Sequence, residues 1–218
     1  MIDLTRDGEV FVLTMHDGEN RLSPPMLDAL DAALTEVAEA EGPRALVTTG
    51  SDRFYSNGLD LDWLGDHPDE MLPYLGRVHA LFARILSMPC ATVAACNGHT
   101  FAAGAMLAIA HDVRVMRSDR GYWCLPEVDL GMPFTPGMNA LIPARLPAMT
   151  AHEAMVTGRR YTGRHGGGRH RGASRSRGRG GARRGGGGPA AGRQGRAGHR
   201  HHPHHAARPV LAALAGEG

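Results

Sequence analysis

The sequence has few cysteines and no long hydrophobic runs, and each shortage excludes a class of protein. Its three cysteines, Cys90, Cys96 and Cys124, are odd in number and form no CxxC pair, which argues against a disulfide framework and against a zinc site. We therefore expect three small buried apolar groups. The apolar runs are too short or too interrupted to span a bilayer, and no signal peptide is visible, so we expect a soluble, cytoplasmic protein.

Acidic and large apolar residues are both missing from residues 164–207, which contain 14 Gly, 11 Arg and 7 His. The net charge of +2 hides this asymmetry, because the rest of the chain carries 13 Arg against 22 acids. A segment of this composition cannot bury enough apolar area to offset about 1 to 2 kcal/mol of backbone entropy per residue. We therefore expect a folded core over residues 1–163, a disordered segment over 164–207 and a short apolar tail over 208–218.

Within residues 1–163, short apolar strands alternate with helical patterns, which predicts an α/β protein. Residues 2–15 alternate as a hairpin should, with Asp7 and Gly8 as its turn. Ser23 is a suitable N-cap, followed by Pro24 at the first helical position, for a helix that ends near Gly42. Further helices are expected over 68–86, 141–146 and 151–156, and further strands over 45–49, 91–95, 112–116 and 122–125.

The most informative stretch is residues 96–112, CNGHTFAAGAMLAIAHD, where a strand ends at Asn97 and Gly98 and small residues then open an apolar helix. The first N–H groups of a helix have no partner inside it, and they lie at the positive end of its dipole. They can therefore bind an oxygen that carries negative charge, as one half of an oxyanion hole does. The alternative is a Gly/Ala helix start that only packs closely against a neighbouring strand.

Two further motifs stand in a telling order around this stretch: YSNGLD at residues 55–60 and PEVDLG at residues 126–131. Together the three motifs resemble the crotonase, or enoyl-CoA hydratase/isomerase, family over about residues 2–163. The resemblance implies a right-handed spiral of ββα units, followed by C-terminal helices that cap the active site and build trimers. It also implies an acyl-CoA substrate whose thioester carbonyl becomes an enolate held by two backbone N–H groups.

Matching the motifs residue by residue gives a candidate site. The resemblance implies oxyanion donors at the N–H groups of Leu59, which follows Gly58, and of Ala103. It places the CoA nucleotide against backbone near Arg21, Leu22 and Ser56. Asn57 and Asp60 are expected to line the thioester pocket.

The candidate catalytic base is Glu127. Hydratases of the family place a second glutamate in the helix after the second donor, where this chain has Met106. Hydration of a double bond is easiest with two carboxylates, whereas a 1,3-proton shift needs one base. We therefore expect isomerisation of 3-enoyl-CoA to 2-enoyl-CoA in fatty-acid oxidation, with enoyl-CoA hydration as the alternative. Desolvation by an apolar wall of Met106 and Leu125 would bring the pKa of Glu127 near neutral.

Other polar residues are assigned structural roles. His79, His99 and His111 have no partner acid or nucleophile at a telling spacing, so we do not expect them to be catalytic. Asp112 is expected to pair locally. No cofactor is implied beyond the coenzyme A of the substrate, and no metal site is expected.

Residues 164–207 stand where the family carries a strand and its C-terminal helices, and three interpretations compete. An Arg/Gly-rich segment could bind nucleic acid, although no aromatic residue is interleaved for stacking. His199, His201, His202, His204 and His205 could bind metal weakly. The favoured hypothesis is a frame error, because GC-rich codons for residues 166–171 read one base forward give Ala-Ala-Ala-Gly-Ile-Val. Without the capping helices, we expect weakened trimer contacts, poor folding and low activity.

Overall fold

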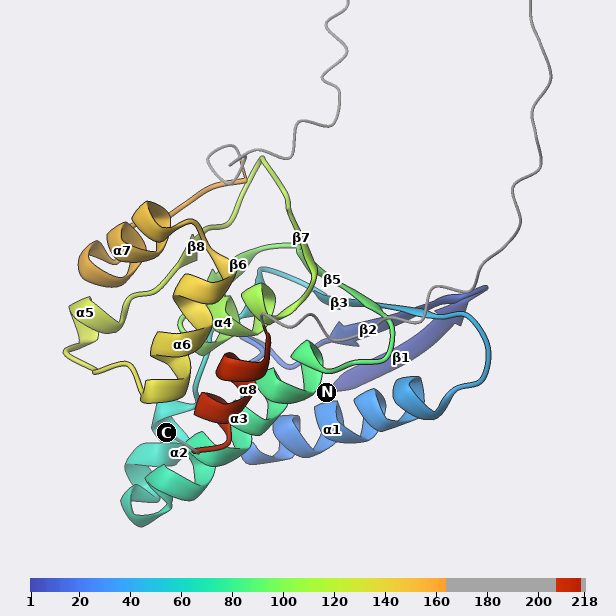
Figure 1. Ribbon diagram of the computed structural model, residues 1–218, viewed down its shortest axis with the longest axis horizontal. Helices are drawn as coiled ribbons and strands as arrows, with labels where there is room; N and C mark the ends of the chain where they lie inside the picture. The colour runs from blue at the N-terminus through green and yellow to red at the C-terminus, as the bar shows by residue number, and fades with distance from the viewer. Residues whose placement is uncertain (164–206, 217–218) are drawn as a thin grey trace, which may run out of the picture.

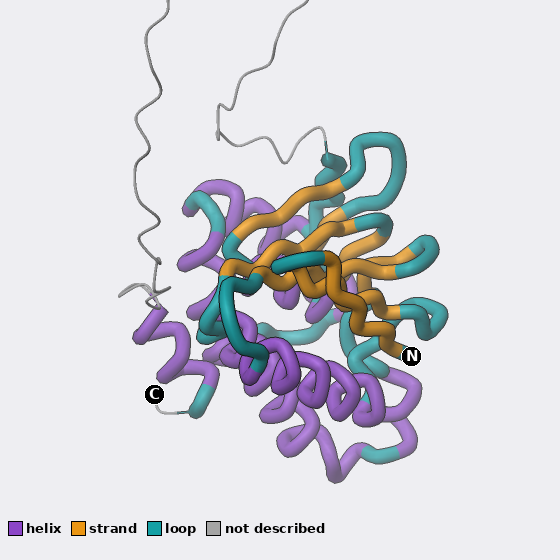
Figure 2. The backbone as a smooth tube through the Cα atoms, turned by 90° about the vertical axis from the view of Figure 1, so that its right-hand side faces the viewer, coloured by secondary structure: helices purple, strands orange, loops and turns teal. Residues whose placement is uncertain are grey.

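The computed structural model describes residues 1–163 and 207–216, and their helices and strands form two sheets packed against a layer of helices (Figures 1 and 2). The elements follow in this order: β1 Ile2–Asp7, β2 Val10–Met15, α1 Pro24–Glu39, β3 Ala45–Gly50, β4 Phe54–Ser56, α2 Leu61–Asp66, the 3-10 turn η1 Pro68–Glu70, α3 Met71–Leu86, β5 Ala91–Cys96, β6 His99–Phe101, α4 Ala103–Ala110, β7 Val113–Met116, β8 Trp123–Cys124, α5 Glu127–Leu130, α6 Pro136–Arg145, α7 Ala148–Thr157 and α8 Arg208–Leu214.

The sheets show a repeating unit. The larger sheet has the order β1-β2-β3-β5-β7, in which only β1 is antiparallel to its neighbour, and the smaller sheet has the parallel order β4-β6-β8. From β3 onward, each turn of the chain therefore adds one strand to the larger sheet, then one to the smaller sheet, and continues into helix. This is the expected spiral of ββα units, and the α/β fold class is confirmed.

Helix α4 lies at the centre of the molecule, and all eight of its residues are buried. A helix that is apolar all round is stable only when it is enclosed on every side. Helices α3 and α6 and strands of both sheets contact α4. The enclosure fixes the position of the helix start, where the sequence places one oxyanion donor.

Several local predictions are confirmed and others need correction. Ser23 caps α1, since its hydroxyl accepts from the Met26 N–H at 3.4 Å. The hairpin turn consists of Gly8 and Glu9, one residue later than predicted, because Gly8 supplies the positive φ of 59° that the turn requires. Helix α6 begins at Pro136, five residues before the predicted start, because Thr135 caps it.

Five short elements were not predicted: β4, β6, α2, α5 and α8. Strand β6 stands between Gly98 and the helix α4, so the predicted strand does not pass straight into the helix. The three cysteines are free and buried, as expected. Asp112, expected to cap or pair locally, instead bonds to β5: its carboxylate accepts from the backbone N–H and the hydroxyl of Thr92 at 2.9 and 3.0 Å.

Helix α8 packs against α6 and α3 and buries Val210 and Leu214 (Figure 1). A Cβ atom on Gly137 of α6 would lie 2.9 Å from the Leu214 side chain, so glycine is what allows the close approach. Disorder was predicted for residues 164–207. Apart from Ala207, these residues lie outside the described part of the chain, so this stays a prediction.

Candidate active site

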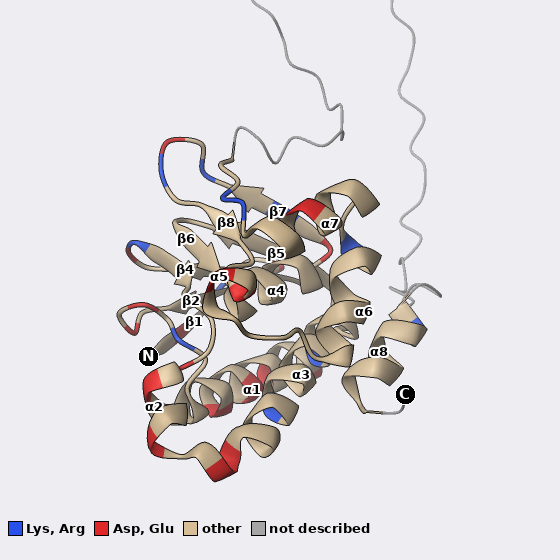
Figure 3. Ribbon diagram, turned by 90° about the vertical axis from the view of Figure 1, so that its left-hand side faces the viewer, with Lys and Arg blue, Asp and Glu red and all other residues tan. Residues whose placement is uncertain are grey.

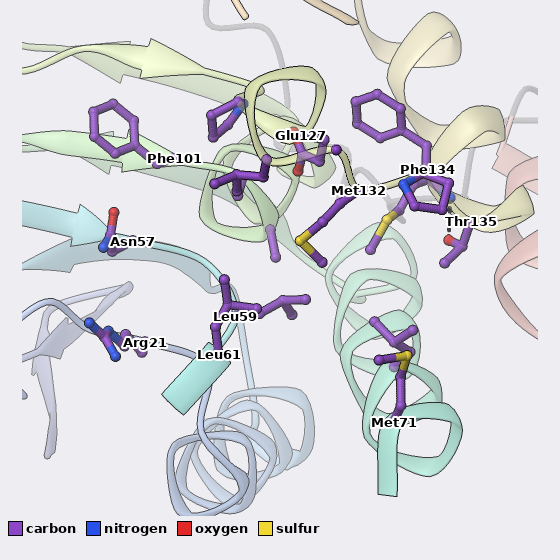
Figure 4. Close-up of a pocket in the computed structure, with 18 of the residues that line it drawn as sticks. Arg21, Asn57, Leu59, Leu61, Met71, Phe101, Glu127, Met132, Phe134 and Thr135 are labelled. Carbon is purple, nitrogen blue, oxygen red and sulfur yellow. Dashed lines mark hydrogen bonds between the residues drawn. The ribbon is translucent and has the colours of Figure 1, made fainter. Parts of the chain in front are cut away.

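A cavity of about 810 Å³ opens beside the start of α4 and runs between α3 and the segment after β8 (Figure 4). Its lining comes from widely separated parts of the chain: Arg21, Asn57, Leu59, Leu61, Asp62, Met71, Leu75, Phe101, Ala102, Ala103, Pro126, Glu127, Leu130, Gly131, Met132, Pro133, Phe134, Thr135, Pro136 and Met138. Volumes of this order are typical of small-molecule sites. The cavity brings together Arg21, Asn57, Leu59, Ala103 and Glu127 from the predicted site.

Leu59 reaches the cavity because the chain turns sharply at Gly58, whose φ is 89°. The neighbouring N–H groups are engaged: that of Gly58 donates to Ser56 Oγ at 3.2 Å, and that of Asp60 donates to Tyr74 Oη at 2.9 Å. Within residues 1–163 and 207–216, the Leu59 N–H has no hydrogen-bond acceptor. It is therefore available to an oxygen of a bound molecule.

Ala103 is the first residue of α4 and follows Ala102, which has a positive φ of 49° and a ψ of −125°. Such a conformation is strained for a residue with a Cβ atom, by about 1 to 3 kcal/mol. Hydrogen bonds hold Ala102 on both sides, since its N–H donates to Cys124 O at 3.1 Å and its carbonyl accepts from the Met106 N–H at 3.0 Å. In the described part of the chain the Ala103 N–H, like that of Leu59, has no acceptor.

The two N–H groups lie close to each other because small residues line the contact between β4 and α4. A Cβ atom on Gly58 would lie 3.0 Å from the Ala103 nitrogen, and one on Gly104 would lie 2.5 Å from the Ser56 carbonyl oxygen. Larger residues at either glycine would push the helix start away from the 56–59 segment. The Ala103 N–H at the start of α4 and the Leu59 N–H in the neighbouring loop are both without an acceptor among the described residues, and N–H groups of this kind can bind an oxygen that carries negative charge.

Glu127 is the first residue of α5 and is buried, with 6% of its surface exposed. Its Oε2 has no hydrogen-bond partner among the described residues, and the side chain lines the cavity (Figure 4). Burial raises the pKa of this carboxyl group from 4.5 to about 7, and a hydrogen bond from its own backbone N–H opposes part of the shift. A carboxylate of this pKa can accept and return a proton near neutral pH.

The predicted apolar wall around Glu127 needs refinement. Met106 and Leu125 are both fully buried, but neither lines the cavity. Leu130 and Met132 do line it, together with Pro126. The apolar surroundings of the carboxyl group on the cavity side therefore come from the segment that carries it.

The three histidines lie outside the cavity lining. His111 is fully buried and accepts at Nε2 from the Thr48 hydroxyl at 3.0 Å, while its Nδ1 lies 2.8 Å from Leu107 O. The same hydroxyl accepts from Tyr55 Oη at 2.8 Å. Burial lowers the pKa of His111 to about 4, so this histidine stays neutral and supports the fold.

The predicted nucleotide and thioester residues divide into two groups. Arg21 and Asn57 line the cavity, whereas Leu22, Ser56 and Asp60 do not. The Leu22 N–H donates to Gly58 O at 2.8 Å, which joins the 19–22 segment to the 57–59 segment. Asp60 caps α2, since its Oδ1 accepts from the Trp63 N–H at 3.3 Å.

Acidic residues bind Arg21 at the mouth of the cavity. Helix α2 carries acidic residues, which are red in Figure 3. The guanidinium donates to Asp62, to Glu19 at 2.9 Å and to Asp60 at 3.5 Å, and its hydrogen bonds to Asp62 and Glu19 raise its pKa above the usual range. Glu19 also accepts from the Asn57 side-chain amide at 3.0 Å. The charge of Arg21 is therefore shared among carboxylates.

Sequence reasoning missed two buried residues that build this mouth. Asn20 has a positive φ of 51° and donates through Nδ2 to the carbonyls of Met15, Phe54 and Tyr55 at 3.2, 3.0 and 3.3 Å. Tyr74 donates to Leu22 O at 2.8 Å. The one signal for Asn20 was its residue type, because asparagine tolerates positive φ and can bond several backbone groups.

No group of three or more potential metal ligands is found among the described residues. Helices in residues 1–163 and 207–216 are all too short or too polar to cross a membrane.

Comparison with known proteins gives consistent results. The enoyl-CoA hydratase/isomerase family profile matches residues 5–166. The peroxisomal enoyl-CoA delta isomerase 2 of Arabidopsis thaliana is 34% identical over 174 residues, covering 75% of this chain and 72% of the relative. A putative enoyl-CoA hydratase of Thermus thermophilus is 35% identical over 166 residues, covering 70% and 62%. The crystal structure of a probable enoyl-CoA hydratase from Mycobacterium tuberculosis superposes with a TM-score of 0.68 at 30% identity, covering 75% of this chain and 70% of that one.

Proposed function

Because the chain belongs to the enoyl-CoA hydratase/isomerase family, we propose that it isomerises 3-enoyl-CoA to 2-enoyl-CoA with Glu127 as its base. One observation carries the proposal: a single buried carboxylate with a pKa of about 7 shares a cavity with the two unengaged N–H groups of Leu59 and Ala103. The second carboxylate that hydration favours is replaced by Met106, which is fully buried. The curated relatives named as delta isomerases support the same reaction.

The proposed mechanism needs only these groups. The substrate thioester oxygen accepts hydrogen bonds from the Leu59 and Ala103 N–H groups, and the Glu127 carboxylate removes a proton from C2. The electron pair of the broken C–H bond forms a dienolate, whose negative oxygen the two N–H groups stabilise. Glu127 then returns the proton to C4, the double bond comes to lie between C2 and C3, and the carboxylate is ionised again. Loss of one such donor costs about 2.7 to 4 kcal/mol in a comparable site.

The rest of the cavity would position the coenzyme A part of the substrate. We assign the end near Arg21 and Asn57 to the coenzyme A side, because both line the cavity there (Figure 4). Leu22, Ser56 and Asp60 would then act by fixing the loops that form this end, through the hydrogen bonds described above. The proposal requires no cofactor beyond the coenzyme A of the substrate.

The test is an assay of the purified protein on 3-enoyl-CoA and 2-enoyl-CoA. We expect isomerisation of the first substrate to exceed hydration of the second. The variant Glu127→Gln keeps the shape of the side chain but cannot take a proton, so isomerisation should fall by at least about 100-fold. Glu39→Gln, an exposed glutamate on α1, is the matched control and should keep full activity. Unchanged isomerisation by Glu127→Gln would refute the assignment of the base.

Hydratase activity, and with it classification as a lyase, is the second candidate, because a relative named as a putative hydratase is 35% identical to this chain. Hydration that exceeds isomerisation in the same assay would favour it. A homotrimer and a cytoplasmic location are further proposals. Two of the relatives are named as peroxisomal, so fractionation of cells that express the protein tests the location directly. Light scattering tests the trimer.

Residues 164–207 remain the subject of a separate proposal, that their sequence results from two compensating frame changes in the gene. The hypotheses of nucleic-acid binding and of metal binding also concern residues outside the described part of the chain. The proposed changes lie near codons 163–166 and 206–209. Support comes from α8, because residues 208–214, at and after the second change, form a helix that packs on α6 and α3. Sequencing independent clones decides the matter, since an intact frame would refute the proposal.

A further inference from the structure

The glycine turn before Leu59 does not by itself decide which way the Leu59 N–H points. Gly58 has a φ of 89°, and glycine adopts positive φ about as readily as negative φ. A hydrogen bond to a substrate oxygen, in contrast, weakens steeply once its angle falls below about 120°. Contacts from other parts of the fold must therefore select the one orientation of this peptide that serves a bound oxygen.

The first such contact acts on the carbonyl end of the peptide between Gly58 and Leu59. This peptide is trans, so its C=O and its N–H point in opposite directions. The Gly58 carbonyl accepts from the Leu22 N–H at 2.8 Å. The Leu59 N–H therefore points away from Leu22, and its direction depends on where the backbone at Leu22 is held.

The hydroxyl of Tyr74 on α3 holds the backbone on both sides of that contact. It donates to the Leu22 carbonyl at 2.8 Å and accepts from the Asp60 N–H at 2.9 Å. A phenolic hydroxyl has one proton to donate and lone pairs to accept with, so one oxygen atom can make both bonds at once. Tyr74 thus joins the segment that positions the Gly58 carbonyl to the residue that follows Leu59.

A second hydroxyl holds the peptide from the other direction. The Gly58 N–H donates to Ser56 Oγ at 3.2 Å. Of the three successive N–H groups at residues 58, 59 and 60, the first and the third are therefore bound by side-chain hydroxyls. The middle one, that of Leu59, has no acceptor among residues 1–163 and 207–216.

The position of the Tyr74 hydroxyl is itself fixed by packing. The residue is 2% exposed, and its ring lies against Trp63 with ring centroids 5.3 Å apart. Burial raises the pKa of Tyr74, so the hydroxyl keeps the proton that it donates. Tyr74 does not line the cavity, so it can influence a bound molecule only through the backbone that it holds.

We propose that Tyr74 is a positioning residue for the reaction, whose hydroxyl, together with that of Ser56, aims the Leu59 N–H at the thioester oxygen. The inference rests on the proposed function, which makes this N–H one of two oxyanion donors. A donor that is aimed in advance needs no rearrangement when negative charge develops on the oxygen. The hydroxyl therefore acts on the transition state more than on binding of the substrate.

The kinetic test is Tyr74→Phe, which removes only the hydroxyl. The kcat for isomerisation of 3-hexenoyl-CoA should fall at least about tenfold, while KM changes less than about twofold. Tyr55→Phe is the matched control, because Tyr55 is also buried and its hydroxyl bonds Thr48 at 2.8 Å instead of this backbone. It should keep kcat within about twofold. A similar loss of kcat in both variants, or an unchanged kcat in Tyr74→Phe, would overturn the proposal.

A spectroscopic test separates this inference from the proposed function. Hydrogen bonds to a thioester C=O lower its stretching frequency, which infrared difference spectra measure for bound hexanoyl-CoA carrying ¹³C at the thioester carbon. The wild-type protein should lower the frequency, and Tyr74→Phe should lose about half of that shift, because one of two donors is no longer aimed. Equal shifts in the two proteins would overturn this inference alone. Absence of a shift in the wild type would overturn the proposed function and this inference with it.

Ser56→Ala repeats the spectroscopic test should Tyr74→Phe fail to fold. It removes the hydroxyl that accepts from the Gly58 N–H and leaves the Tyr74 bonds in place. The variant should lose part of the wild-type shift while it binds hexanoyl-CoA with an affinity within about threefold of the wild type. A full shift in Ser56→Ala would contradict the proposal that hydroxyl groups orient this peptide.

Discussion

Replacement of Glu127 by glutamine should stabilise the folded protein at alkaline pH while it removes the base. Burial raises the pKa of this carboxyl group from 4.5 to about 7. The folded state therefore prefers the protonated form, and the stability that this form contributes is present below pH 4.5 and is lost as the pH rises through about 7. Above pH 7 the buried carboxylate is ionised without a hydrogen-bond partner for Oε2 among the described residues.

The size of the effect follows from the pKa shift. One pKa unit corresponds to about 1.4 kcal/mol, so ionised Glu127 costs the folded state about 3 kcal/mol above pH 7. Glutamine fills nearly the same space and carries no charge. The variant should therefore gain up to about 3 kcal/mol at pH 8 and almost nothing at pH 4. In a protein of this size, the gain corresponds to a rise in Tm of about 6 to 12 °C at pH 8.

The assay is thermal or urea unfolding of the wild type and Glu127→Gln at pH 4 and pH 8. The difference between the two proteins at each pH isolates Glu127, because every other titrating group is present in both. Glu39→Gln is the control and should show no pH-dependent difference. A gain of the same size at both pH values, or a loss at pH 8, would refute the conclusion that burial raises the pKa of Glu127.

Three further predictions follow from the site. Isomerase kcat/KM should rise about tenfold per pH unit below pH 7 and level off above it, because Glu127 must be ionised to take the proton; a profile flat from pH 5 to pH 8 would contradict this. Gly58→Ala should lower kcat by about 100-fold or more, because its Cβ atom would lie 3.0 Å from the Ala103 nitrogen at a φ of 89°; the kinetics of a variant that is still folded by circular dichroism measure the loss. The contribution of His111 to stability should fall by about 3 kcal/mol as the pH drops from 6.5 to 4, because burial lowers the pKa of His111 to about 4 and the unfolded chain takes up the proton first; the difference in urea unfolding between the wild type and His111→Gln isolates this contribution, since Glu127 titrates in both.

The sequence predicted the elements whose signals are local. The cap at Ser23 needs only a hydroxyl before a proline and a helical pattern. The proposed donors at Leu59 and Ala103 rest instead on the family resemblance, and both residues line the cavity with N–H groups that have no acceptor among the described residues. The raised pKa of Glu127 follows from its apolar surroundings. On the cavity side these are Pro126, Leu130 and Met132 and not the predicted Met106 and Leu125.

The sequence could not predict features that depend on long-range pairing. Strands β4 and β6 have three residues each, too few for a periodic pattern, and they exist because β4, β6 and β8 pair with one another across the spiral. The four-residue helix α5 is equally short. Asn20 was missed because its role is to bond carbonyls of Met15, Phe54 and Tyr55, which only the folded chain brings together.

The strained backbone conformation of Ala102 also bears on which chirality of amino acid suits this position. A φ of 49° with a ψ of −125° is the mirror image of an extended conformation that ordinary L-residues adopt without strain. At this one position, just before the helix that offers the Ala103 N–H, the backbone therefore has the geometry of a D-amino acid. A protein assembled by chemical ligation with D-alanine at residue 102 would keep the same backbone path. The D-residue would adopt this φ and ψ without the strain that L-alanine has there.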